Sequence, residues 1–365
     1  MACRLNKLRE KMKREPQKKL TKMSTKQKEI LRQNVGIDVS KDKLSVCFYE
    51  LEKGLAKKIK GSRSFSNTPG GYEELVEWAQ KRQVEGLVLG FALEATGVYH
   101  ENVVYYLSDH GYKVSVLLAN QVKSYIASLN IKTKTDKVDA KALGQIGLER
   151  DLKAWKAPKA ALRQLKQLSR ERVSLLEERT MLSNKLHAMK SSYEYNRSSI
   201  FRLEGRIAFY DDQVKEVETH IEQVVNQDKE LKEKIENICT IKGLGEISVL
   251  TILAETNGFE LFSSRSQLVS YAGYDVVEKQ SGTSVNGKTR ISKKGNRFIR
   301  RVLHFPAISA ARHEPIFKAL YERVYDRTKI KMKGLVAVQR KLLIYIYTLY
   351  KKNEAFDPQF GSSKV

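Results

Sequence analysis

Cysteine is scarce in this 365-residue chain, and long apolar runs are missing. Cys3, Cys47 and Cys239 lie far apart and match neither a disulfide framework nor a zinc spacing, which favours a reducing compartment. No run of 18 apolar residues occurs, so no membrane span is expected. The basic N-terminus is followed by no apolar h-region, so no secretory signal is expected either. These absences predict a cytoplasmic or nucleoid-associated protein.

Acidic residues are also outnumbered. The chain has 67 Lys and Arg against 42 Asp and Glu, a formal net charge of +25. Its hydrophobic content of 41% can build a core, which excludes a disordered basic tail. A charge this large argues against an ordinary metabolic enzyme and indicates a polyanionic partner, most often nucleic acid. A merely over-basic soluble protein is the alternative.

Composition predicts five segments along the chain. Residues 1–33 form a basic arm, expected to be flexible, with 12 Lys and Arg against three Glu. Residues 34–155 alternate strand and helix patterns, and residues 156–238 are typical of long helices. A further globular domain is expected at 239–352, followed by a tail at 353–365.

The segment 34–155 shows three strand patterns followed by helix, strand, helix, strand and helix. Val35–Val39 and Leu44–Tyr49 predict a hairpin, and Ile59–Phe65 predicts a third strand. Leu87–Leu93 is an apolar run typical of a buried strand. A three-strand meander feeding a βαβαβ half is the order of the α/β ribonuclease-H-like fold.

Four acidic residues stand at particular places in this pattern. Asp38 lies inside the first apolar run, where a charge is costly to bury unless it binds a cation or a partner. Glu94 follows a later strand, and Asp136 and Asp139 stand three residues apart at a helix start. Because the first strand is expected beside the fourth, Asp38 and Glu94 should be neighbours, with that helix packed across them.

Four carboxylates in one place repel each other, so the cluster makes sense if a divalent metal fills it. All the expected ligands are oxygens and no His or Cys lies nearby in sequence, so Mg²⁺ is favoured, with Mn²⁺ as a substitute. Two such ions can clamp the attacking and leaving oxygens of a phosphodiester. Taken singly, each acid could instead be a helix cap or a surface charge.

Residues 160–238 contain no proline and carry a heptad pattern of apolar residues. The pattern is strongest from Ile200 to Ile238, with Asp228 as its one polar member. Two long helices packed antiparallel as a coiled coil, within one chain or between chains, are expected. A single parallel dimeric coil is the alternative. The coil predicts a homo-oligomer, a dimer or a tetramer.

The last domain is expected to be mainly helical. Ile241–Gly245, between two helical stretches, is typical of a helix-hairpin-helix whose free N–H groups can hold a phosphate, although a plain turn fits nearly as well. A dense basic cluster downstream predicts contacts with a nucleic-acid backbone, with a solvated helix face as the alternative. Its members are Lys288, Arg290, Lys293, Lys294, Arg297, Arg300 and Arg301. Similar contacts are expected beside the acids from Lys132, Lys134 and Lys137.

Together these motifs resemble the DEDD signature of insertion-sequence transposases of the IS110 family, which have a RuvC-like N-terminal domain. Asp38 stands in Gly-Ile-Asp-Val-Ser-Lys and Glu94 in Glu-Ala-Thr-Gly. Asp136 and Asp139 stand in Lys-Thr-Asp-Lys-Val-Asp-Ala. The C-terminal half is similar to the family's second transposase domain, in stretches such as Gln280-Ser281-Gly282.

The resemblance implies a bridge-RNA-guided serine recombinase that binds donor DNA, target DNA and a structured guide RNA. A serine of the C-terminal domain would attack the scissile phosphate and form a transient phosphoserine bond, while metal-bound carboxylates activate it. The resemblance favours Ser281 as this serine. Ser284 is its rival, and Ser292 is expected to cap a helix or contact a phosphate.

Two other functions stay open at this point. The first is a metal-dependent nuclease or Holliday-junction resolvase, in which the same carboxylates activate water and Ser281 is structural. The second is a non-catalytic coiled-coil scaffold with vestigial acids, against which the intact set of four acids argues.

Overall fold

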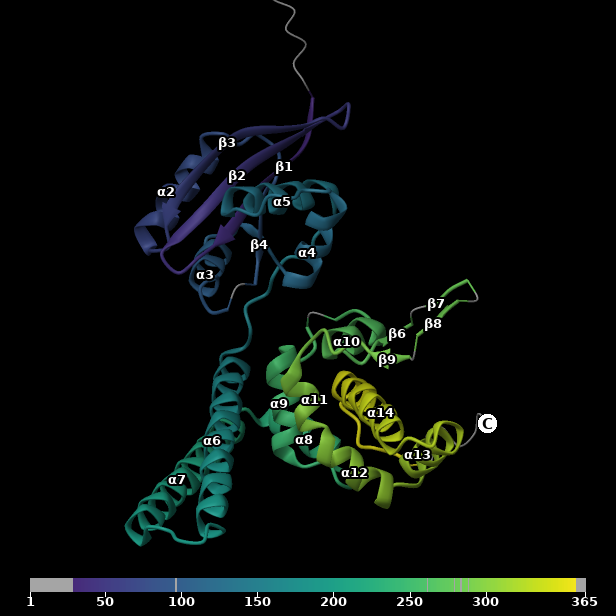
Figure 1. Ribbon diagram of the computed structural model, residues 1–365. Helices are drawn as coiled ribbons and strands as arrows, with labels where there is room; N and C mark the ends of the chain where they lie inside the picture. Colours follow the sequence, from purple (N-terminus) through teal and green to yellow (C-terminus); the bar gives the residue numbers. More distant parts are fainter. Residues whose placement is uncertain are drawn as a thin grey trace, which may run out of the picture. The chain divides into compact units, whose positions relative to one another are not determined.

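The computed structural model describes residues 29–358, except positions 96, 261, 279, 283 and 288 and the side chains of 285 and 286. The chain divides into two compact units, residues 1–157 and 158–365, each described here by itself (Figure 1). The basic arm up to residue 28 lies outside the described residues. None of the helices in the described part of the chain has the length and apolarity that a bilayer crossing requires.

The N-terminal unit is built on a five-stranded sheet. Its elements are β1 (Ile30–Val39), β2 (Lys43–Glu52), β3 (Lys57–Ser66), α2 (Pro69–Gln80), β4 (Leu89–Glu94), α3 (Glu101–Asp109), β5 (Lys113–Leu117), α4 (Ala119–Ser128) and α5 (Asp136–Glu149). The strand order is β3-β2-β1-β4-β5, with antiparallel pairing from β1 to β3 and parallel pairing from β1 to β5. This is the predicted ribonuclease-H-like order. β1 starts at Ile30, inside the segment assigned to the arm.

Helices cover both faces of β1. Val35 and Ile37 face a core that α2 and α3 complete on one side. On the other side α5 packs against β1 and β2 (Figure 1). A Cβ atom at Gly36 would lie 2.1 Å from the Ala140 carbonyl oxygen, so glycine is required for this close approach. The approach carries the first turn of α5 over the sheet, close to the end of β1.

The C-terminal unit is mainly helical. Its elements are α6 (Ala160–Lys190), α7 (Arg197–Gln227), α8 (Lys229–Cys239), α9 (Glu246–Thr256), α10 (Arg265–Ala272), β6 (Val276–Val277), β7 (Gln280–Ser281), β8 (Val285–Asn286), β9 (Arg290–Ile291), α11 (Arg297–Val302), α12 (His304–His313), α13 (Pro315–Thr328) and α14 (Lys331–Lys352). One apolar core joins the bases of α6 and α7 to α8–α14 and to Phe356 of the expected tail. The segments 156–238 and 239–352 are therefore parts of one body rather than two.

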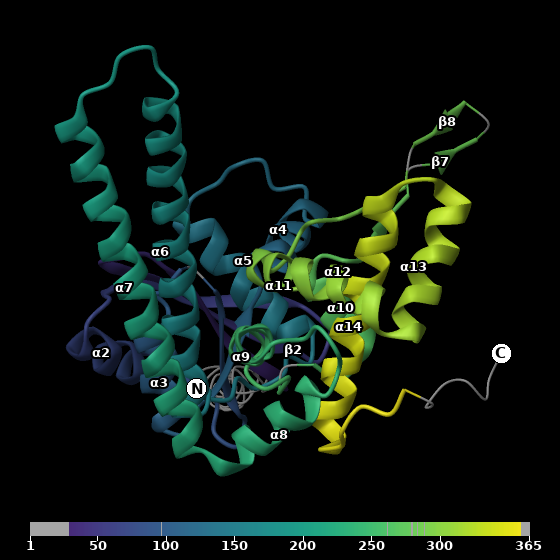
Figure 2. The same cartoon turned by 90° about the horizontal axis from the view of Figure 1, so that it is seen from below.

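Helices α6 and α7 form a hairpin within one chain (Figure 2). Arg172 pairs with Glu218 at 2.6 Å, and Lys190 pairs with Glu204 at 2.7 Å, so residue numbers rise on one helix as they fall on the other. This pairing is antiparallel, as the first of the two sequence interpretations requires. The single parallel dimeric coil does not describe these helices.

The second helix of this pair does not run through to Ile238, as the heptad pattern predicts. α7 ends at Gln227 and α8 begins at Lys229. Between them Asp228 accepts a hydrogen bond from the Leu231 N–H at 3.0 Å, which caps the start of α8. The single polar member of the heptad pattern is therefore a helix boundary, and α8 turns into the core beside α9.

Candidate active site

The four predicted acids come from three elements of the N-terminal unit. Asp38 lies near the end of β1, Glu94 ends β4, and Asp136 and Asp139 occupy the first turn of α5. β1 and β4 are parallel and paired in register up to the residues just before Asp38 and Glu94. Those two acids therefore lie side by side at the same edge of the sheet, as predicted.

The residue before α5 determines where this helix begins. The Thr135 side chain accepts a hydrogen bond from the Val138 N–H at 3.3 Å and caps the helix. Asp136 and Asp139 then fall in the first turn, where a negative charge is favourable toward the helix dipole. The cap thus sets the position of two of the four acids.

Electrostatics shows that the four acids share one environment. Burial, followed by the negative charges of Asp139, Asp136 and Glu94, raises the pKa of Asp38 from 3.8 to about 6. Burial also raises the pKa of Glu94 and that of Asp139, and the Asp139 charge adds to the rise at Glu94. The structure therefore brings the predicted acids together, and their mutual repulsion disfavours ionisation of Asp38.

The donor chemistry of this cluster fits a hard divalent cation, because every side chain offers carboxylate oxygens and the repulsion among them would be relieved by positive charge. Among the described residues, no three His, Cys, Asp or Glu side chains are arranged as a ready-made set of metal ligands. The acids are thus gathered electrostatically without forming a closed cage.

The lysines predicted beside the acids are all exposed. Lys132 and Lys134 lie in the segment that leads to α5, and Lys137 lies in its first turn. The Lys134 charge opposes the rise in pKa at Asp38 and Glu94, so its ammonium lies within electrostatic reach of the cluster. Anionic groups that approach the acids would meet these cations.

Ser281 lies in the C-terminal unit, on a two-stranded arm that extends from it (Figure 1). β6 pairs with β9 at the base of the arm, and β7 pairs with β8 further out. Ser281 is exposed, stands opposite Val285 and precedes Gly282, whose φ of +55° suits the turn. Ser284 is exposed in the same turn. Strands of two residues are too short to show alternation, so the sequence did not reveal this arm.

Ser292 supports the base of the two-stranded arm that carries Ser281. Its hydroxyl donates to the Asp275 carboxylate at 2.7 Å, and its N–H donates to the Asp275 carbonyl at 2.8 Å. The same hydroxyl accepts from the Lys294 N–H at 3.2 Å. Ser292 therefore supports the loop, and the cap of the following helix α11 is Asn296 instead.

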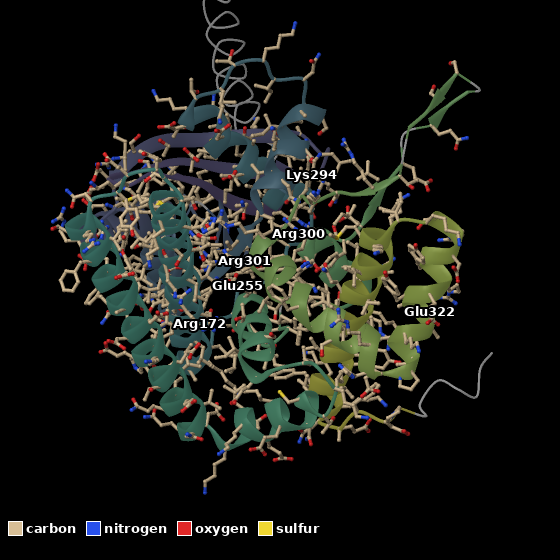
Figure 3. All side chains as sticks on the ribbon, turned by 60° about the horizontal axis from the view of Figure 1, so that its bottom comes forward. Arg172, Glu255, Lys294, Arg300, Arg301 and Glu322 are labelled. Carbon is tan, nitrogen blue, oxygen red and sulfur yellow. The ribbon has the colours of Figure 1, made fainter. Side chains whose placement is uncertain are left out.

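The basic cluster has exposed members and members that are engaged within the fold; Figure 3 labels Lys294, Arg300 and Arg301 among them. Lys288 lies outside the described residues. The exposed members that follow the arm are Arg290, Lys293, Lys294 and Arg297. These four side chains are available to an anionic partner.

Arg300 and Arg301 are already engaged within the fold. Arg300 donates to the Ala272 carbonyl at 2.7 Å and to the Asn296 carbonyl at 3.3 Å, so it closes the end of α10. Arg301 forms an ion pair with Glu177 of α6. Arg300 has a structural role, because it is half-buried and donates to backbone carbonyls.

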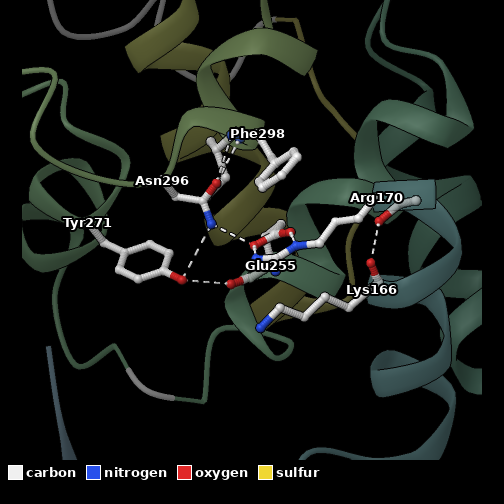
Figure 4. Close-up of polar contacts among 8 residues, drawn as sticks. Lys166, Arg170, Glu255, Tyr271, Asn296 and Phe298 are labelled. Atoms are coloured by element: carbon white, nitrogen blue, oxygen red, sulfur yellow. Dashed lines mark hydrogen bonds and ion pairs between the residues drawn. The ribbon is translucent and has the colours of Figure 1, made fainter. Parts of the chain in front are cut away.

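A buried ionic cluster lies beneath this basic segment, and no sequence pattern indicated it (Figure 4). The fully buried Glu255 carboxylate on α9 accepts two bonds from Arg170 of α6, at 2.6 and 2.9 Å. It also accepts from the Asn296 amide at 2.6 Å, while the Tyr271 hydroxyl donates to the Glu255 carbonyl at 3.0 Å. Asn296 caps α11 by accepting from the Phe298 N–H at 2.9 Å. This cluster ties the helical hairpin to the end of the basic segment.

Comparison with known proteins identifies the family of the chain. A family model described as transposase matches residues 35–193, and one described as transposase of the IS116/IS110/IS902 family matches residues 235–322. A pilin gene-inverting protein of Moraxella bovis is 30% identical over 332 residues, which cover 88% of this chain and 97% of that protein. The chain belongs to the IS110 family of DEDD transposases. It is a DNA recombinase/transposase.

A second relative and a solved structure match smaller parts of the chain. An insertion element IS110 protein of 43.6 kDa from Streptomyces coelicolor is 22% identical over 120 residues, 33% of this chain and 29% of that protein. Among solved structures, Thermus thermophilus RuvC with a Holliday junction substrate aligns at 14% identity with a TM-score of 0.27, covering 34% of this chain and 99% of that one. Such a TM-score carries no weight, so the fold assignment rests on the strand order itself.

Proposed function

We propose that this IS110-family transposase cuts and exchanges DNA strands through a phosphoserine intermediate, with Ser281 as the nucleophile and the four acids as its activating group. The observation that carries the proposal is the gathering of Asp38, Glu94, Asp136 and Asp139 around the end of β1, where their charges act on one another. The exposed position of Ser281 on its arm supports its role, because a nucleophile for DNA must reach a bulky phosphodiester.

The proposed chemistry balances without an external energy source. The Ser281 Oγ attacks the scissile phosphorus, an Oγ–P bond forms, and the bond from phosphorus to a sugar oxygen breaks. The serine proton passes to a carboxylate, and the leaving sugar oxygen takes up a proton. A sugar hydroxyl of the second strand then attacks the phosphoserine, which rejoins DNA and restores the serine. No ATP is needed, because the phosphodiester energy is kept in the covalent bond.

Mg²⁺, or Mn²⁺ in its place, is the cofactor we propose for the acids. Asp38, Glu94, Asp136 and Asp139 would hold it through carboxylate oxygens, which are the ligands that such cations prefer. When bound, it supplies a Lewis acid that stabilises negative charge on the phosphoryl oxygens. The raised pKa of Asp38 supports this proposal, because a nearby cation would relieve the repulsion that contributes to it.

The proposed partners are donor DNA, target DNA, a structured guide RNA and further copies of the chain. The exposed cations beside the arm and those beside the acids would hold backbone phosphates. They are Arg290, Lys293, Lys294, Arg297, Lys132, Lys134 and Lys137. A net charge of +25 supports a set of polyanionic partners that includes RNA as well as DNA. The Moraxella relative is named for inverting a pilin gene, which fits a strand-exchange reaction on DNA.

A covalent adduct tests the proposal. The protein is incubated with Mg²⁺, with DNA that carries both flanks of its own gene, and with RNA transcribed from those flanks. We expect a protein–DNA adduct on a denaturing gel that persists in Ser284→Ala and is absent in Ser281→Ala. Asp38→Asn and chelation of the metal should both remove it.

The competing function gives a different result, because the four acids are gathered within the N-terminal unit without any contribution from Ser281. A nuclease that activates water would cut DNA in the presence of Mg²⁺ without an adduct and equally well in Ser281→Ala. An adduct that survives Ser281→Ala but is lost in Ser284→Ala would move the nucleophile to Ser284. Undiminished cutting by Asp38→Asn would overturn the role of the acids.

A further inference from the structure

A row of small hydroxyl side chains runs across the sheet from the acids. In the antiparallel register Asp38 stands opposite Ser45, and Ser45 stands opposite Ser64. The neighbouring row places Cys47 opposite Ser62, whose hydroxyl donates to the Cys47 sulfur at 3.3 Å. Residues directly opposite each other project from the same face. Asp38 and the three serines therefore share the sheet face on which α5 lies.

A cavity of about 260 Å³ lies between this face and α5. Its lining residues are Ser45, Val46, Ser62, Arg63, Ser64, Lys137 and Lys141. Strand alternation directs Val46 and Arg63 to the other face, where Arg63 pairs with Glu74 of α2 at 3.5 Å. The polar side chains left to line the cavity are three hydroxyls and two ammonium groups.

The two lysines lie one turn apart on α5, and both are exposed. In the part of the chain that the structure describes, no ion pair joins Lys137 or Lys141 to a carboxylate. The Lys141 charge acts on the Cys47 thiol, where it opposes the rise in pKa that burial causes. The Lys141 ammonium therefore lies over the face that carries the serines, and the two lysines bring positive charge to the cavity.

We propose that this cavity binds backbone phosphates of the DNA strand that enters the acid cluster. Phosphate oxygens accept hydrogen bonds from hydroxyls and ammonium groups, and the lining offers both with no acid among its side chains. Ser62 and Ser64 are exposed at this cavity, and Ser45, which is 6% exposed, lies deeper in the row. The row from Ser64 through Ser45 leads to Asp38, so a strand seated here is directed at the acids.

This inference rests on the proposed function for its choice of DNA, since DNA is the strand that the acids would act on. It adds Ser45, Ser62, Ser64 and Lys141 to the residues that bind substrate. It also gives Lys137 a second role, as one wall of the cavity.

The salt dependence of binding tests the site without any need for catalysis. Full-length protein is titrated in EDTA against a fluorescein-labelled single-stranded DNA at several KCl concentrations. For the double variant Lys137→Gln/Lys141→Gln, the slope of log Kd against log salt should fall by about 1.4, because each lost contact with a single strand accounts for about 0.7. The matched double variant Lys123→Gln/Lys153→Gln changes the same charge on exposed lysines of the same unit and should keep the slope.

A second pair of variants separates the cavity from net charge. Ser64→Asp, which places a carboxylate in the cavity, should weaken DNA binding about tenfold, whereas Ser64→Thr keeps the hydroxyl and should bind as the wild type does. Tryptophan fluorescence confirms folding, since Trp78 and Trp155 both lie in this unit. An equal fall of the slope in both lysine double variants would overturn the proposal. So would a fall seen with RNA of the same sequence but not with DNA.

Failure of this inference differs from failure of the proposed function. Unchanged salt slopes in a protein that still forms the serine adduct would overturn the cavity and leave the reaction standing. If the salt slope falls in Lys137→Gln/Lys141→Gln as expected but the wild-type protein never cuts DNA, the cavity is supported and the proposed reaction is overturned.

Discussion

Asp38 carries a charge that the metal-free protein tolerates poorly at neutral pH. Its folded-state pKa of about 6 lies above the ordinary value of 3.8, so the folded state binds the proton more tightly than the unfolded chain. The stabilisation of the folded state by the Asp38 proton is complete below about pH 4 and is lost as the pH rises through about 6. In protein treated with chelator, Asp38→Asn should therefore be more stable than the wild type near pH 7, and the difference should vanish near pH 4.

The measurement is urea unfolding followed by tryptophan fluorescence, because both tryptophans report on the N-terminal unit. Asp151→Asn makes the same substitution at an exposed site of this unit and should show no such pH-dependent gain. If the free energies of unfolding of Asp38→Asn and the wild type differed by the same amount at every pH, the assigned cause would be wrong.

At the scale of single residues, some of the site was open to prediction and some was not. Asp38 stood out because a charge inside an apolar strand is rare, and Asp136 and Asp139 because they stand three residues apart at a helix start. Ser281 and its neighbours form no such pattern, and only the family resemblance singled out that serine. The serine row was invisible, because each member is an ordinary strand residue until the register of three strands aligns them.

At the scale of elements, the Glu255 cluster sets the position of the basic segment relative to the helical hairpin. The Glu255 side chain is 0% exposed and Arg170 is 45% exposed. Glu255→Gln leaves the guanidinium without its bidentate partner, so it should destabilise the C-terminal unit by about 3 kcal/mol, the low end for a broken buried pair because Arg170 keeps some water contact. Urea unfolding followed by helical circular dichroism measures the loss.

Glu177→Gln is the matched control. Glu177 of α6 also pairs with an arginine of another helix, Arg301 of α11. Both partners are about half exposed, so loss of this pair should cost about 0–1 kcal/mol. If the two variants lose the same stability, the buried cluster does not fix the segment. A Glu255→Gln protein that folds but forms less serine adduct would show that the segment's position matters for the reaction.

Short-range patterns account for which elements could be predicted. The strands of the N-terminal unit were found because apolar runs and turns define them locally. The Arg170–Glu255 contact joins residues 85 positions apart, which no local pattern reveals. Asp228 was taken as a polar member of one continuous heptad pattern, although its side chain makes it a good cap and hence a boundary. α13 was not predicted, and Phe317 is its only fully buried apolar side chain among those described.

At the scale of the whole molecule, the boundary near residue 157 was predictable. The single core that the two predicted segments beyond this boundary share was not. The pattern changes there from alternating strands and helices to long helices, and the structure divides the chain at nearly the same place. The predicted division at 238 fails because Leu162 and Leu165 of α6 pack in the same core as α9 and α14. Heptad periodicity shows that a helix has an apolar face but not which element covers it.

The outer part of the helical hairpin is the surface through which we expect copies of the chain to associate. Met181, Phe201 and Phe209 are 62%, 77% and 61% exposed on α6 and α7. The 2.5 Å ion pair of Arg179 with Asp211 holds the two helices together at this level, which brings Met181 and Phe209 to the same height. A second copy that covered these side chains would gain about 1.5–3 kcal/mol for each phenylalanine fully buried.

We therefore expect Phe201→Ser/Phe209→Ser to weaken self-association by about 100-fold or more, since two such side chains contribute at least about 3 kcal/mol. Light scattering at fixed concentration should then show the mass falling toward that of one chain, with the helical signal unchanged because neither side chain belongs to the core. Phe305→Ser removes an equally exposed phenylalanine from α12 and should leave the mass as it is. A mass unchanged in the double variant, or lowered as much by Phe305→Ser, would place the contact between copies elsewhere.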